Sequence, residues 1–149
     1  MRLRAFFGLF FAVLLSAVSL YSAAWLKNPY GRGSELALKA ASEYYLYSPS
    51  SQAKIVGDVD FAQSFFLTGE STTFVFPSEQ TAENYVSGLL QEQGAAIVWE
   101  EECLGARSIY AYAPKRGGGI VLSGKRVNLH LVWKGEHVRV GSPIVFGGY

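Results

Sequence analysis

The stretch "SEQTAENYVSGLLQEQGAAIVWEE", residues 78–101, changes its hydrophobic period halfway along. Ser78 suits a helix N-cap and Gly94 suits the left-handed residue that ends a helix, so we expect a helix between them. Beyond the glycine, Ile97 and Trp99 alternate with their neighbours, which is typical of a strand. The apolar residues of the first part recur at the spacing of one helix face: Ala82, Tyr85, Val86, Leu89 and Leu90.

The period of two continues to the C-terminus, interrupted by short turns, and predicts an antiparallel meander. Its strands are expected at residues 95–101, 108–113, 119–123, 126–133, 137–140 and 142–146. Upstream, strands are expected at 53–61, 64–69 and 71–77, after a short helix capped by Ser34 that runs to Tyr45. A one-sided sheet needs a cover, so the predicted class is α+β, with helices packed on one face of an antiparallel sheet.

The N-terminus carries an uncharged apolar run over residues 5–26, preceded by Arg2 and Arg4. As a helix this run is about 33 Å long, enough to cross a bilayer. It predicts either an uncleaved transmembrane signal anchor or a cleaved signal peptide over residues 1–26. Residues 27–33 form a linker and 34–149 one domain. Both alternatives place the domain outside the cytoplasm, tethered to the cell membrane in the first and secreted in the second.

Charge is distributed unevenly along the chain. Residues 51–106 hold Lys54 against nine carboxylates, a net charge of −8, whereas 107–149 hold seven cations against Glu136, a net charge of +6. One interpretation is a solvated helix face together with cations that protect strand edges. The other is a basic rim for an anionic polymer.

The stretch "PKRGGG", residues 114–119, follows a predicted strand and is the candidate ligand site. Consecutive glycines can turn several N–H groups toward an anion beside two cations. The alternative is a hairpin loop in which the glycines supply positive φ angles. The candidate anion-binding residues are Tyr110, Tyr112, Lys115, Arg116, Gly117, Gly118 and Gly119.

Catalytic and metal-binding patterns are not found in the sequence. Cys103, His130 and His137 fit no zinc spacing, and no G-x-S-x-G elbow occurs. We therefore predict a non-enzyme without catalytic residues, metal or cofactor. Eleven cations against twelve anions in residues 27–149 also argue against nucleic-acid binding.

Three C-terminal motifs, "SIYAYAP" (108–114), "GKRVNLHLVW" (124–133) and "VGSPIVF" (140–146), resemble the YwmB-like family of Gram-positive envelope proteins in order and spacing. The resemblance covers residues 69–149. It implies a fold like that of the TATA-box-binding protein, without DNA binding, and an envelope or sporulation role. It implies no catalytic residues.

The predicted function is therefore that of a membrane-tethered, extracytoplasmic, non-enzymatic domain that binds an envelope component or a protein partner. Two alternatives remain. One is a secreted envelope hydrolase that uses His130 or His137 with Glu100 or Glu102. The other is an assembly protein whose exposed sheet face pairs with a second copy, and the sequence leaves the oligomeric state undetermined.

Overall fold

The computed structural model describes residues 8, 10–20, 41–46, 54–60, 63 and 67–145. The main feature of this part is one antiparallel sheet of seven strands, in the order β2-β1-β3-β9-β8-β5-β4. The strands are β1 (Glu43–Leu46), β2 (Lys54–Val56), β3 (Leu67–Val75), β4 (Ala96–Cys103), β5 (Ala106–Tyr112), β8 (Leu129–Lys134) and β9 (His137–Ser142). A separate hairpin of β6 (Ile120–Leu122) and β7 (Lys125–Val127) and a 3₁₀ turn, η1 (Pro114–Arg116), lie between β5 and β8.

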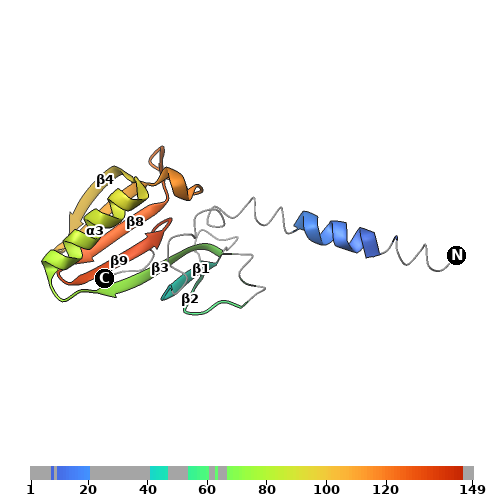
Figure 1. Cartoon of the computed structure of the whole chain (residues 1–149), viewed down its shortest axis with the longest axis horizontal. Helices are drawn as coiled ribbons and strands as arrows, with labels where there is room; N and C mark the ends of the chain where they lie inside the picture. The colour runs from blue at the N-terminus through green and yellow to red at the C-terminus, as the bar shows by residue number, and fades with distance from the viewer. Residues whose placement is uncertain are drawn as a thin grey trace.

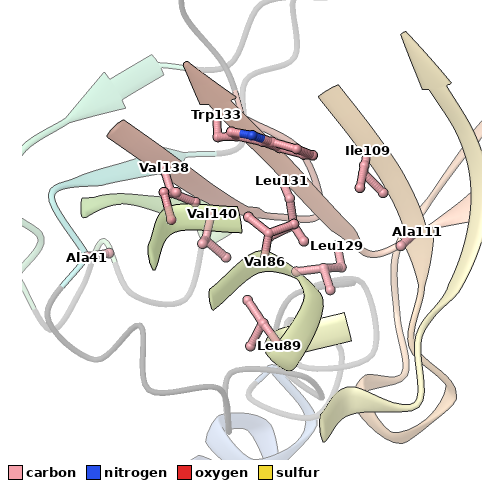
Figure 2. Packing of buried hydrophobic residues seen from close by; sticks show 11 residues of the cluster. Ala41, Val86, Leu89, Ile109, Ala111, Leu129, Leu131, Trp133, Val138 and Val140 are labelled. Carbon is pink, nitrogen blue, oxygen red and sulfur yellow. The ribbon is translucent and has the colours of Figure 1, made fainter. Parts of the chain in front are cut away.

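One helix, α3 (Glu79–Gln93), lies across one face of the sheet (Figure 1). The Ser78 side chain accepts the N–H of Thr81 at 3.2 Å, and Gly94 ends the helix at a φ of 57°, so the expected caps are confirmed. Val86 and Leu89 point from α3 toward the sheet (Figure 2). The sheet residues of this core are Ile109, Ala111, Leu129, Leu131, Trp133, Val138 and Val140.

The predicted fold class is wrong. The described residues are 47% strand and 30% helix, so the sheet dominates and one helix, not a layer of helices, lies on it. The implied likeness to the TATA-box-binding-protein fold falls with this prediction. The physical reason is that three further strands, β1, β2 and β3, extend the sheet beyond the meander, whereas α3 packs mainly on β8 and β9.

The predicted membrane-spanning helix over residues 5–26 is also not supported. Residue 8 and residues 10–20 are helical, and residues 5–7, 9 and 21–26 of the predicted span lie outside the described ranges. Across the described ranges, the chain has no helix that is long and apolar enough to cross a membrane.

The helix expected from Ser34 to Tyr45 ends in a strand instead, because Tyr44 and Tyr45 belong to β1. Residues 34–40 lie outside the described ranges. The tyrosines alternate: Tyr45 is fully buried and its hydroxyl donates to Ser71 Oγ at 2.8 Å, while Tyr44 packs against the core on the other face. Aromatic residues favour such a half-buried pleated surface.

Residues 67–75 of the two strands expected at 64–69 and 71–77 form one continuous strand, β3, and residues 64–66 lie outside the described ranges. Gly69, expected as the last residue of the first of these strands, lies inside β3 and allows a close approach between backbones. A Cβ at this position would lie 2.5 Å from the Ser142 carbonyl oxygen and 2.9 Å from Pro143.

The single strand expected at 126–133 is divided at Asn128 into β7 and β8, and residues 143–145 do not form the last strand expected at 142–146. β9 instead continues to Ser142, and the segment after it folds onto Gly141.

Candidate binding cleft

A cleft of about 500 Å³ lies between the first turns of α3 and one end of the sheet. The sheet contributes the β4–β5 turn and the β8–β9 turn, which meet there because β5 pairs with both β4 and β8. Its charged and aromatic lining residues are Glu79, Glu83, Glu102, Arg107, Trp133 and Lys134.

Arg107 is central to the cleft. Its register partners are Glu102 on β4 and Trp133 on β8, so all three side chains project from the helix-covered face. The guanidinium carbon lies 5.1 Å from the centre of the Trp133 ring, a cation–π distance. Arg107 Nη2 and Nε also donate to Glu100 Oε2 at 2.7 and 3.2 Å. The cation is therefore held in place from two sides.

Carboxylates surround this arginine. The hydrogen bond to Glu100 is the largest effect and raises the pKa of Arg107. Burial opposes it, and the negative charges of Glu100, Glu83 and Glu102 each raise the pKa by a smaller amount. Within the described residues, Glu79, Glu83 and Glu102 form no ion pair of their own. The cleft consequently has more carboxylates than cations, and favours a ligand group that is positively charged.

The opposite face of the sheet carries a stack of three rings. Tyr110 lies between Trp99 and His130, with ring centroids 4.5 and 4.1 Å away and both pairs stacked. The Tyr110 hydroxyl donates to Glu101 Oε1 at 2.6 Å. Tyr110 and Tyr112 are half-buried on β5. Both tyrosines therefore belong to this face and not to the cleft.

His130 is buried in this stack and is 5% exposed. Its Nδ1 accepts the N–H of Val145 at 3.0 Å, and burial lowers its pKa from 6.5 to about 4, so the ring is neutral at pH 7. Glu100 and Glu102 pair with Ile109 and Arg107 and so point to the helix-covered face. His130 is thus on the other side of the sheet from the two carboxylates that the hydrolase alternative requires.

His137 begins β9 as an exposed residue and shares the face of His130 by register, so it too is separated from those two carboxylates. In the described part of the chain, no three His, Cys, Asp or Glu side chains are grouped to hold a metal ion. Cys103, the one cysteine, is exposed at the end of β4.

The loop that the sequence singled out, Pro114–Gly119, lies at the other end of β5 from the cleft. Lys115 is exposed, but Arg116 is buried and only 3% exposed. Gly117, Gly118 and Gly119 all have positive φ, at 61°, 58° and 98°. These angles are the ones that the hairpin-loop interpretation requires.

Asn128 holds this loop closed, and sequence reasoning missed it. Its Oδ1 accepts the N–H of Ala113 at 2.7 Å, and its Nδ2 donates to the carbonyls of Ala113 and Gly117, both at 2.9 Å. Asn128 is 2% exposed. The sequence signal for this role was the polar Asn128 within the alternating apolar run at residues 126–133.

Arg107 and Trp133 were missed as site residues because they are 26 positions apart in the sequence and meet only through the pairing of β5 with β8. Comparison with family models, with curated proteins and with solved structures finds no match. The resemblance to the YwmB-like family therefore stays a prediction.

Proposed function

We propose that this chain is a non-enzymatic binding domain that acts outside the cytoplasm, where its cleft binds a cationic group of an envelope-associated partner. The observation that carries the proposal is the arrangement around Arg107. Its guanidinium lies over the Trp133 ring among Glu83, Glu100 and Glu102, beside a cleft of about 500 Å³. The basic start and apolar run of the N-terminus support export.

The proposal favours the cleft over the Pro114–Gly119 loop that the sequence suggested. With Arg116 buried, Lys115 is the exposed cation of that loop, and one exposed lysine supplies little affinity for an anionic polymer. In the cleft, by contrast, Glu79, Glu83 and Glu102 face the same space. Neighbouring carboxylates that share one space attract a cation together.

The test is a titration of the full chain with a short lysine-rich peptide, followed through backbone amide chemical shifts, with a glutamate-rich peptide for comparison. We expect shifts at α3 residues 79–83, at the β4–β5 turn and at Trp133–Gly135, and we expect them to fade as salt is added. Shifts confined to Pro114–Gly119 with the glutamate-rich peptide would instead support the anion-binding loop and overturn the proposal.

Two variants sharpen this test. Replacing two of the three cleft carboxylates, Glu83→Gln with Glu102→Gln, is expected to weaken lysine-peptide binding about tenfold, since each exposed charge contributes up to about 1 kcal/mol. The matched control is Glu92→Gln, an exposed carboxylate on the same helix that does not line the cleft. The control removes one charge and the double variant two, so a loss of binding free energy in the double variant of only twice that in the control would mean that the peptide responds only to net charge.

A further inference from the structure

β4 is the last strand of the sheet on the side of the cleft. It pairs with β5 on one side, and the described strands include none on its other side (Figure 1). Its side chains are open to solvent: Ile97 is 48% exposed, and the four residues from Glu100 to Cys103 are all exposed. The free edge therefore presents backbone N–H and C=O groups that can pair with another strand.

This edge carries two features that limit strand addition, one irregularity and three charged side chains, but it lacks the commonest ones. Proline and lysine are the common blocking residues on edges, and β4 contains neither. Its one irregularity lies between Ile97 and Trp99. From Trp99 to Cys103 the register with β5 is continuous, so five consecutive residues offer regular geometry to an added strand.

The charge of β4 selects the occupant. Glu100 and Glu102 point to the helix-covered face and Glu101 to the opposite face, so both sides of the edge are acidic. Two copies of β4 placed edge to edge would bring carboxylates against carboxylates, which is unfavourable. A strand that carries lysine or arginine would instead place opposite charges across the new pair, which stabilises it.

The edge is also continuous with the cleft, because Glu102 belongs to both. Alternate side chains of an added strand point to the helix-covered face, toward the space bounded by Glu83 and Glu102. We infer that β4 accepts an extended, lysine- or arginine-rich segment of a partner protein as an eighth strand, with its cationic side chains directed into the cleft. The inference rests on the proposed function and adds the mode of binding.

The experiment uses the full chain and two probes of identical charge. One probe is a short peptide that alternates lysine with threonine, and the other is the same peptide methylated on its backbone nitrogens. Methylation removes the N–H donors but keeps every cation. We expect methylation to weaken binding about tenfold or more, because a few net hydrogen bonds of about 1 kcal/mol each are lost. Amide hydrogen exchange of β4 is expected to slow with the first probe alone.

The outcomes separate the two proposals. Binding of both peptides within twofold of each other would overturn strand addition and leave the cationic cleft intact. Failure of both to bind would overturn the proposed function and the inference together. The third outcome comes from sedimentation of the chain alone. Self-association that slows hydrogen exchange of the β4 amides would mean that a second copy of the chain occupies the edge, and would overturn the inference. A protein that stays monomeric and shows the methylation effect supports it.

Discussion

Arg107 lies at one end of β5, beside an open cleft, whereas Arg116 lies beyond the other end of β5, within a closed loop. The Arg107 side chain is 48% exposed and lies on Trp133 between carboxylates, whereas Arg116 is 3% exposed. At the open end, polar groups face a space that a ligand can enter. At the closed end, Asn128 satisfies backbone groups of the loop, and the glycines follow the turn.

A basic, glycine-rich sequence therefore does not by itself identify a binding loop. Both ends contain cations, turns and glycines in the sequence, and they differ in where the polar groups are satisfied. A buried amide that bonds three backbone atoms makes a rigid structural unit. At the cleft, by contrast, Glu79, Glu83 and Glu102 line open space beside the half-exposed Arg107, and that space remains available to a partner. Four measurements test whether the two ends of β5 differ in this way.

The largest effect is expected for Asn128→Ala. The change leaves the Ala113 N–H and the carbonyls of Ala113 and Gly117 without their side-chain partner, at a site that is 2% exposed. With about 1–3 kcal/mol for each buried unsatisfied group, we expect the free energy of unfolding to fall by about 4 kcal/mol in urea denaturation. The control, Asn84→Ala on the exposed side of α3, should stay within about 0.5 kcal/mol. A similar loss in both proteins would contradict a structural role for Asn128.

The second effect is a loss of stability in acid that depends on His130. Its pKa is lowered to about 4 in the folded protein from 6.5, so the unfolded chain takes up the proton more readily. The contribution of neutral His130 to the free energy of unfolding is therefore fully present above pH 6.5. It decreases as the pH falls from 6.5 to 4, and below pH 4 the free energy of unfolding is lower by about 3 kcal/mol.

Denaturation of the protein and of His130→Gln, measured between pH 7 and 4.5, isolates this contribution as the difference between the two pH slopes. The exposed His137 provides the control, because His137→Gln should keep the slope of the unsubstituted protein. A slope that persists in His130→Gln would assign the acid sensitivity to carboxylates.

The third effect compares neighbours in the loop. Arg116→Ala removes a long buried side chain and should lower the free energy of unfolding by about 2 kcal/mol or more, because its stem packs in the interior. Lys115→Ala removes an exposed side chain and should change it by less than about 0.5 kcal/mol. The two values come from the same thermal or urea unfolding assay. A larger loss of stability in Lys115→Ala than in Arg116→Ala would contradict the description of the Pro114–Gly119 loop as closed.

The fourth measurement concerns the cleft, where a small effect on stability is expected. Arg107→Gln loses a half-exposed ion pair and a cation–π contact, so the free energy of unfolding should fall by less than about 1 kcal/mol. The affinity for a lysine-rich peptide should rise about threefold, since Glu83, Glu100 and Glu102 lose their competing cation. Weaker binding would show that Arg107 itself contacts the peptide, and isothermal titration decides between the two.

Sequence patterns located the elements of the C-terminal half well. The cap at Ser78, the exit at Gly94 and the alternation after it correspond to α3, β4 and β5 within a few residues. These signals are local, because a helix cap or an alternating face depends on residues a few positions apart. The N-terminal half was predicted poorly: Tyr44 and Tyr45 were expected in a helix, and two strands were expected where β3 is continuous.

The candidate site could not be predicted in the same way. Arg107 and Trp133 become neighbours through the register of β5 with β8, and Glu83 joins them only because α3 crosses that end of the sheet. Such contacts link residues far apart in the chain, and no local pattern encodes them. Conversely, the Lys115–Arg116 pair looked functional because exposure cannot be read from a turn sequence.

By itself, then, the sequence determined the helix from its caps, the strands from their alternation and the uneven charge from its composition. Tertiary structure alone decided which charges are buried, which edge of the sheet stays unpaired and which side chains share a cleft. The physical reason is that local periodicity reflects one face of one element. Burial, pairing and electrostatic surroundings depend on what the rest of the chain places against that face.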